Sequence, residues 1–324
     1  MSKDTGWRTR DARRREDEPP PPEPSEEQIR AVIARHRLGV DLADVTRLRS
    51  SGTVNTALGL GARFVLRVPK LLGVRETQTE SVAAPVAKAA GIRTPALLVY
   101  DDSREIFEVP YTIYERVAGE NFGLSDLRAE VSAAVYREIG TQLAVLHERV
   151  TSCSDPHGYL ATPSRPDPDD LVEHLGSESL LSAYNVEWLR RVLDRLRPAV
   201  VAARRLRRFL HNDVLPTNMI VRDGALAALI DWNDSGWGDP ALEFVSLPGR
   251  ALPYILEGYR QIRALDDEET APHRMLWDHL CQALEFLIAP VNKDNISWAR
   301  PPFARVMEMV STAASYPPWQ ALLR

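Results

Sequence analysis

The stretch Phe209–Glu243 reads FLHNDVLPTNMIVRDGALAALIDWNDSGWGDPALE, and it contains two short apolar runs, Met219–Val221 and Leu226–Ile230. The runs are separated by residues that include Asp223-Gly224, and Asp-Gly between two β-type segments is a hairpin signal. In a hairpin, the residues before the first strand and those after the second strand lie at the same end. The sequence therefore predicts a loop and a hairpin whose polar flanks meet.

Three polar side chains fall at that end of the predicted hairpin. Asp213 and Asn218 lie on the loop before it, and Asp231 stands at the end of its second strand. Phosphoryl transfer needs a carboxylate beside the attacking hydroxyl and hard oxygen ligands for the Mg²⁺ that bridges the phosphates of ATP. We interpret Asp213 as the catalytic carboxylate, and Asn218 and Asp231 as the Mg²⁺ ligands. A polar loop with unrelated acids is the alternative.

The spacing His211-x-Asp213-x4-Asn218 is that of the protein-kinase catalytic loop, with Asn212 in place of its arginine. The kinase Asp-Phe-Gly motif is missing. The residues that replace and follow it are Ile230-Asp231-Trp232-x-Asp234, Gly238-Asp239-Pro240 and Glu243. The combination resembles the aminoglycoside phosphotransferase (APH) family of kinase-like small-molecule phosphotransferases.

The resemblance implies an α+β fold of the bilobal protein-kinase type, with a β-rich N-lobe and a mainly helical C-lobe. Residues 25–117 would form the N-lobe, which binds the nucleotide, and residues 118–324 the C-lobe, with the hinge near 117–119. The resemblance also implies that His211 and Asp239 support the catalytic loop, Asp239 through the backbone N–H groups of the loop. Residues 1–24 are charged and proline-rich, so we expect a disordered tail.

Composition excludes several other classes of protein. The net charge of −5 and the pI near 5.9 argue against a general nucleic-acid binder. No apolar run approaches the roughly 20 residues of a membrane-spanning helix, and the N-terminus lacks the apolar segment of a signal peptide. With only Cys153 and Cys281, a disulfide framework is implausible, and both cysteines fit packing roles in a reducing compartment. We therefore expect a cytoplasmic protein.

The N-lobe should contain strands at Val45–Ser50, Thr56–Leu60 and Arg63–Val68, after a helix that begins at Ser25. The loop between the first two strands reads Ser51-Gly52-Thr53-Val54-Asn55. A glycine among small polar residues lets backbone N–H groups approach phosphate oxygens. We predict that Ser51, Gly52 and Asn55 contact the nucleotide, and a plain turn is the alternative.

A phosphate-binding cation is expected on the third of these strands. By the resemblance, Arg67 takes the place of the kinase lysine, and it keeps the charge while adding a planar fork of donors. Lys70 is the competing candidate. A helix over residues 76–90, closed by Gly91, would supply Glu80 as the carboxylate that pairs with Arg67, with Glu76 as the alternative.

The two lobes should be joined after two further strands, Ala96–Tyr100 and Ile106–Val109. The segment Tyr111–Val117 resembles the strand and hinge of kinase-like folds. The adenine base of the nucleotide would then bond backbone groups near Glu115 and Val117.

The rest of the chain reads mainly as helices. From Ser125, apolar residues recur at spacings of three and four and end at His147, which we expect to be buried and hydrogen-bonded rather than a ligand. Residues 151–178 form a loop-rich insert whose acids face either a cationic substrate or solvent. Helical periodicity resumes through Leu180–Leu206 and again over residues 253–324.

The function predicted from these features is transfer of the γ-phosphoryl group of ATP, or of GTP as the alternative, to a hydroxyl of a small natural product. An antibiotic is the leading acceptor. The alternatives are Ser/Thr of a peptide precursor, a metabolite such as a sugar, choline or homoserine, and an inactive nucleotide-binding scaffold. The expected state is a monomer or homodimer, without nucleic-acid or membrane partners. Basic residues after position 253 disfavour a polycationic aminoglycoside, namely Arg260, Arg263, Arg274, Lys293, Arg300 and Arg305.

Overall fold

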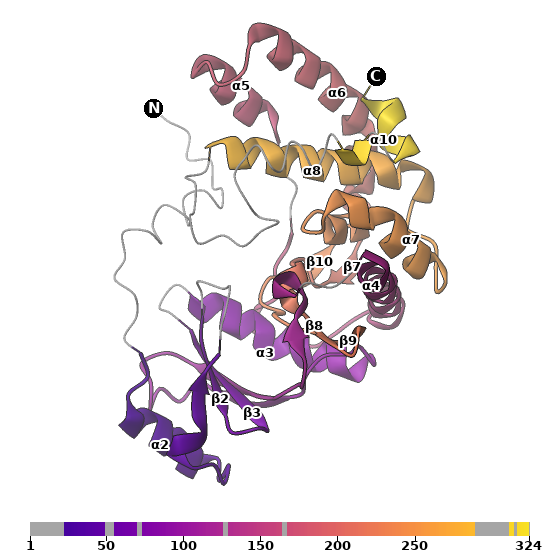
Figure 1. The fold of residues 1–324 in the computed structure, drawn as a ribbon. Helices are drawn as coiled ribbons and strands as arrows, with labels where there is room; N and C mark the ends of the chain where they lie inside the picture. Colours follow the sequence, from indigo (N-terminus) through magenta and orange to yellow (C-terminus); the bar gives the residue numbers. More distant parts are fainter. Residues whose placement is uncertain are drawn as a thin grey trace.

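A five-stranded antiparallel sheet with a helix on each side forms the N-terminal part of the structure (Figure 1). The computed structural model describes residues 23–48, 55–69, 73–125, 129–163, 167–288, 311–313 and 316–323. The sheet has the order β1-β2-β3-β5-β4, with β1 at Val45–Arg47, β2 at Asn55–Leu60, β3 at Phe64–Pro69, β5 at Tyr111–Glu115 and β4 at Leu97–Asp101. β1 is thus shorter than expected.

The helix α2, Glu26–Arg35, covers one face of this sheet. Its N-terminus carries a capping box, because Gln28 N donates to Ser25 Oγ over 3.2 Å and Ser25 N donates to Gln28 Oε1 over 2.9 Å. Ile29 and Val32 are buried against inward-facing side chains of the strands, such as Leu66. This small apolar cluster holds α2 against the face of the sheet that points away from the C-terminal half.

The helix α3, Val74–Ala89, lies on the opposite side, between the sheet and the helical part of the chain (Figure 1). Its buried alanines, among them Ala83 and Ala87, belong to the same apolar cluster as Ile139 of the C-terminal half. The helix ends as predicted at Gly91, which adopts the left-handed φ of +87°. α3 is therefore packed as part of the larger core.

The predicted strand Ile106–Val109 is wrong. In the structure β4 pairs directly with β5, and residues 106–109 follow an irregular path before Pro110. Phe107 and Val109 are buried in the apolar cluster under α2, and the carbonyl of Ile106 accepts from the Gln28 side chain. The apolar character of this segment thus serves packing and not strand pairing.

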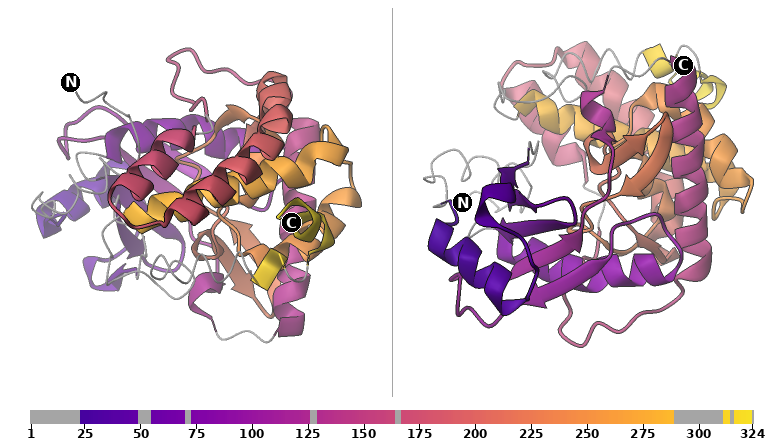
Figure 2. Two further views of the ribbon diagram at one scale, coloured as in Figure 1. Left: turned by 90° about the horizontal axis from the view of Figure 1, so that it is seen from above. Right: turned by 60° about the horizontal axis from the view of Figure 1, so that its bottom comes forward.

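The C-terminal half is mainly helical. Its helices are α4 at Ala129–Arg149, α5 at Asp169–Ser177, α6 at Ala183–Ala202, α7 at Leu252–Arg260, α8 at Ala271–Ile288 and α10 at Pro317–Leu322. α5 and α6 lie over α8 (Figures 1 and 2). None of the helices in the described ranges has the length and apolarity needed to span a membrane.

One of these helices corrects the sequence analysis. α5 occupies the end of the segment 151–178, which we expected to be loop-rich. The acids Asp169 and Asp170 stand in its first turn, where carboxylates stabilise a helix N-terminus, and Val172 and Leu175 are fully buried. The acidic run is thus a helix start.

Two small sheets hold the central stretch of sequence. β7, Arg208–Leu210, pairs with β10, Gly236–Gly238, and the hairpin β8–β9, Met219–Arg222 and Ala225–Leu229, adds the short β6, Glu120–Asn121. Asp223 and Gly224 in the turn both have positive φ, as the Asp-Gly signal predicts. The hairpin prediction is confirmed.

Candidate active site

The loop after β7 carries the predicted catalytic carboxylate. Asn218 Nδ2 donates to Asp213 Oδ2 over 2.8 Å and to the Asp213 carbonyl over 2.9 Å. Asn212, just before Asp213, has a left-handed φ of +64°, a conformation that asparagine tolerates better than most residues. The loop therefore turns sharply at Asn212, and Asn218 holds both the backbone and the carboxylate of Asp213.

His211 braces this loop from inside. Its Nε2 lies 3.0 Å from the carbonyl of Ile230, and its Nδ1 lies 3.3 Å from Asp213 N. A carbonyl can only accept and a backbone N–H can only donate, so Nε2 carries the proton and Nδ1 accepts. Burial is the largest influence on the ring and lowers the pKa of His211 below its ordinary value, against the attraction of Glu243. The geometry thus requires a neutral imidazole.

A pH dependence of stability follows from this neutral ring. Because the folded pKa of His211 is lowered, the unfolded chain binds the proton more readily, and this contribution to stability is complete above pH about 6.5. It is lost as the pH falls below that value, by at most about 1.4 kcal/mol per pH unit. The free energy of unfolding, measured with urea at several pH values between about 5 and 8, should depend less on pH in His211→Asn than in the wild type. Asparagine keeps an acceptor but does not titrate. Identical curves would contradict the neutral tautomer.

Glu243, and not Asp239, holds the backbone of the catalytic loop. The Glu243 carboxylate is fully buried and accepts from His211 N over 2.6 Å and from Asn212 N over 2.9 Å, one on each oxygen. Asp239 instead caps the short helix Pro240–Phe244 through Ala241 N and forms an ion pair with Arg274 at 3.1 Å. The supporting role expected of Asp239 thus belongs to the carboxylate four residues later.

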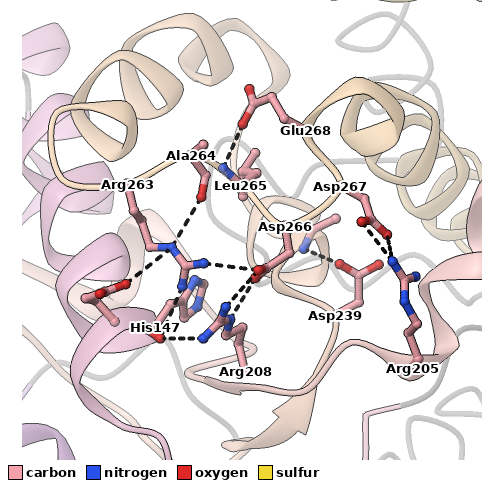
Figure 3. Close-up of polar contacts among 12 residues, drawn as sticks. His147, Arg205, Arg208, Asp239, Arg263, Ala264, Leu265, Asp266, Asp267 and Glu268 are labelled. Atoms are coloured by element: carbon pink, nitrogen blue, oxygen red, sulfur yellow. Dashed lines mark hydrogen bonds and ion pairs between the residues drawn. The ribbon is translucent and has the colours of Figure 1, made fainter.

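His147 lies behind Glu243. Its Nε2 is 3.4 Å from Glu243 Oε1 and its Nδ1 is 2.7 Å from the Tyr259 hydroxyl, and the side chain is fully buried. The prediction of a buried, hydrogen-bonded histidine is confirmed. Figure 3 shows the surrounding contacts, in which Asp266 accepts from both Arg208 and Arg263 while the carbonyl of His147 accepts from the same two arginines. These contacts tie β7, which leads into the catalytic loop, to the segment before α8.

The hairpin brings Asn218 and Asp231 to one end. Ile230 N donates to the carbonyl of Asn218 over 2.9 Å, one step beyond the pair Met219–Leu229. Asp231 follows directly, with a left-handed φ of +73°. Because Nδ2 of Asn218 donates to Asp213, its oxygen Oδ1 is the atom that can ligate a cation.

Arg67 of β3 joins the N-terminal sheet to this site. Its Nη1 contacts Glu80 of α3, and its Nη2 lies 2.5 Å from Asp231 Oδ1. Burial raises the pKa of Glu80, an effect that Arg67 opposes and Asp231 reinforces. Burial disfavours the charge of Arg67, yet Asp231 and Glu80 outweigh it and raise its pKa. One guanidinium thus binds two carboxylates from opposite sides of the site.

The remaining predicted nucleotide contacts are partly placed. Ser51, Gly52 and the alternative cation Lys70 lie outside the described residues. Asn55 is the first residue of β2, opposite Pro69. Glu115 is the last residue of β5, and its N–H donates to the carbonyl of Ala96 over 2.9 Å. Val117 follows two residues later. The nucleotide contacts predicted at Glu115 and Val117 stay predictions.

A family model described as the phosphotransferase enzyme family, APH, matches residues 44–275, which is well over half of the chain and includes every residue of this site. The chain belongs to the APH family. It is accordingly a phosphotransferase with an alcohol group as acceptor. A search of curated proteins finds no match by sequence.

Solved structures agree with this APH assignment in fold. The GDP complex of wild-type aminoglycoside 2'-phosphotransferase-IIIa is 16% identical, with a TM-score of 0.61 over 90% of this chain and 99% of that one. A choline/ethanolamine kinase family protein from Mesorhizobium loti is 19% identical, with a TM-score of 0.57 over 91% and 99%. The streptomycin–ATP complex of APH(2")-IIa is 18% identical, with a TM-score of 0.56 over 88% and 95%. The predicted bilobal kinase-like fold is confirmed.

The role of Glu243 in this APH-family protein can be tested by a change of one atom. Glu243→Gln keeps the volume, but its NH₂ group would face one of the two backbone N–H groups of the loop. An unpaired buried donor costs about 1–3 kcal/mol, so we expect kcat to fall roughly tenfold to a hundredfold, with a smaller change in KM for the nucleotide.

The control is Asp239→Asn, which removes a carboxylate of the same segment that bonds Ala241 N and Arg274. It should lower the melting temperature, because Arg274 loses its charged partner, yet preserve kcat below the melting transition. Steady-state kinetics with an acceptor found by the screen below provide the measurement. Equal losses of kcat in the two variants would show that Glu243 acts only through stability.

Proposed function

We propose that this APH-family protein transfers the γ-phosphoryl group of a nucleoside triphosphate to a hydroxyl of a small natural product, with an antibiotic as the leading acceptor. The observation that carries the proposal is the convergence of Asp213, Asn218 and Asp231 at one end of the hairpin, with the hydrogen bond from Asn218 to Asp213. ATP is the expected co-substrate and GTP the alternative. Structures of similar fold contain ATP or GDP.

Asp213 is proposed to accept or orient the proton of the acceptor hydroxyl. In a loose phosphoryl-transfer transition state little covalent work is left to the protein, so the placement of the groups matters more than basicity. Asn218 fixes the carboxylate, and Glu243 fixes the backbone on its N-terminal side. Both restraints act before any substrate binds.

The polar end of the hairpin suits Mg²⁺. Asn218 Oδ1 and the Asp231 carboxylate are hard oxygen donors, and Mg²⁺ in nucleotide sites takes one or two protein ligands and completes its shell with phosphates and water. Among the residues that the structure describes, no cluster of three or more His, Cys, Asp or Glu could hold a metal ion by itself. When bound, Mg²⁺ would withdraw charge from the phosphates.

Arg67 is proposed to neutralise further phosphate charge. Its side chain is mostly buried, and Glu80 holds it from the side of α3. Its other nitrogen faces Asp231, the proposed Mg²⁺ ligand. The guanidinium would then lie at the border between bound Mg²⁺ and the phosphates.

Charge does not decide the class of acceptor. Arg260, Arg263 and Arg274, counted above against a polycationic acceptor, form ion pairs with Glu268, Asp266 and Asp239, respectively. The acids of the segment 151–178 are partly compensated, because Asp167 and Asp169 share the single Arg197. The arginines therefore give no argument against a polycationic acceptor, and the pairing leaves only part of the acidic charge to favour one.

A mass-spectrometric screen tests the proposal. Purified protein, Mg²⁺ and ATP or GTP would be incubated with hydroxylated antibiotics, nucleosides, sugars, choline, homoserine and Ser/Thr peptides. Gain of one phosphoryl group that is absent with the Asp213→Ala variant would identify the acceptor class. A phosphorylated peptide or metabolite would favour the corresponding alternative. Failure to bind either nucleotide would refute the kinase proposal.

A further inference from the structure

The segment between α4 and α5 reaches back to α3. We name its residues Asp155–Ala161 the interlobe strap. The hydroxyl of Thr79 donates to the carbonyl of Tyr159 over 2.7 Å, and Arg75 Nη2 donates to the carbonyl of Gly158 over 2.7 Å. The Arg75 guanidinium also lies over the Tyr159 ring, 5.9 Å from its centroid. Two consecutive turns of α3 are thus bonded to the strap.

The other end of the strap is bonded to the segment that follows Asp231. Ala161 N donates to the carbonyl of Ser235 over 2.9 Å, and Trp237 N donates to the carbonyl of Ala161 over 3.3 Å. A Cβ atom on Gly236 would lie 1.9 Å from the Ala161 oxygen, so only glycine permits this approach. The strap therefore joins α3 to β10, a few residues from the proposed Mg²⁺ ligand.

The strap has a defined shape. The Asp155 carboxylate accepts from Tyr159 N over 2.8 Å on one oxygen and from Leu160 N over 2.9 Å on the other. Gly158 completes the turn with a left-handed φ of +63°. Asp155 thereby aims the carbonyls of Gly158 and Tyr159 at α3.

The segment that follows α3 is bonded to the hairpin and to Trp232. Leu229 N donates to the carbonyl of Arg93 over 2.7 Å, and the Trp232 indole donates to the Thr94 hydroxyl over 2.9 Å. Asp231 lies between Leu229 and Trp232 in the chain, and Ser235 follows it four residues later. The start of α3, through the strap, and the segment that follows α3 are therefore both hydrogen-bonded to residues that flank Asp231.

We propose that Thr79 and Asp155 are positioning residues for phosphoryl transfer, which set the rotation of α3 so that Glu80 holds Arg67 toward the nucleotide. Consecutive helix residues point about 100° apart, so Thr79 can bond the strap while Glu80, the next residue, contacts Arg67. Neither residue touches the nucleotide in this scheme. The inference rests on the proposed function.

The chain offers a matched set of variants. Thr79→Val removes the hydroxyl and keeps the shape, and Thr79→Ser restores the hydroxyl. Thr77→Val is the control. Thr77 is equally buried on α3, but among the described residues its hydroxyl bonds only to the carbonyl of Gly73, just before the same helix. Calorimetric titration with Mg²⁺-ADP gives the affinity. Exchange of the backbone amide hydrogens of α3, Ala161 and Trp237, measured without nucleotide, shows whether α3 stabilises the hydrogen bonds between the strap and β10.

We expect Thr79→Val to weaken Mg²⁺-ADP binding about fivefold to tenfold, the effect of one buried hydrogen bond, and to speed exchange at Ala161 and Trp237. Thr79→Ser and Thr77→Val should stay within about twofold of the wild type. Asp155→Ala should weaken binding similarly, and the double variant should lose less than the sum, because both changes break one connection.

Equal affinity and equal exchange in Thr79→Val and Thr77→Val would overturn the inference. A wild-type protein that binds no nucleotide would refute the proposed function, and the exchange measurement would then decide the coupling alone. Faster exchange in Thr79→Val than in Thr77→Val would support it, and unchanged exchange would overturn it.

Discussion

Replacing Asp213 with alanine should lower kcat roughly a hundredfold to ten-thousandfold, the range for a positioned proton acceptor, and leave the affinity for Mg²⁺-nucleotide nearly unchanged. The reason is the division of labour in the site. Asp213 stands on the loop before the hairpin, bonded to Asn218, while Arg67 and Asp231 meet where we propose that the nucleotide binds. Kinetics with the identified acceptor and titration with Mg²⁺-ADP measure the two quantities separately.

The matched control for this variant is Asp223→Asn. Asp223 is a carboxylate at the opposite end of the same hairpin, 94% exposed, and asparagine tolerates its positive φ. This change should leave kcat within about twofold of the wild type, as is usual for surface substitutions. Full activity in Asp213→Ala would show that the catalytic carboxylate lies elsewhere.

Replacing Asp231 with asparagine should abolish most of the Mg²⁺-dependent part of nucleotide binding and lower kcat/KM about a thousandfold, since metal stabilisation of charge is worth several kcal/mol. The effect on metal-free nucleotide should have the opposite sign. Asp231 competes with phosphate for Arg67, so its neutralisation frees one arm of the guanidinium. Metal-free ADP should therefore bind as tightly as to the wild type or more tightly.

Titration with ADP in Mg²⁺ and in EDTA tests this pair of effects. Glu80→Gln is the comparison, because Glu80 touches the other arm of Arg67 and is not a proposed metal ligand. That variant should weaken binding both with and without Mg²⁺. If Asp231→Asn weakened both forms of ADP binding equally, Asp231 would act through Arg67 and not through a metal ion.

The hairpin and the loop before it were predictable because their signals are local. Asp223-Gly224 encodes the turn, but a β-bulge between Ile220 and Val221 shifts the register by one residue, so that Asn218 lies beside Ile230 and not beside Leu229. The spacing of Asp213 and Asn218 within one tight loop likewise needs no distant contact. The proximity of Arg67 and Asp231, 164 residues apart, followed only from the family resemblance.

Tertiary packing decided what the sequence could not. Asp239 and Glu243 are both carboxylates of one motif, and only the folded chain shows which of them meets the N–H groups of His211 and Asn212. The segment 106–109 is apolar enough for a strand, but its side chains fill the cluster under α2 and its backbone pairs with no strand. Nothing in the pattern of 151–163 indicated that it returns to α3.

The helix α3 belongs to the N-lobe by its position in the chain, but to the core of the C-terminal half by its packing. Its alanines share one apolar cluster with α4 and the hairpin, while the sheet beside it has a separate cluster with α2. A fragment cut at residue 117 would carry α3 without its apolar partners in the C-terminal half, and the surface so exposed favours aggregation. Cooperative melting should therefore group α3 with the C-terminal half and leave the outer sheet and α2 as the part able to loosen alone.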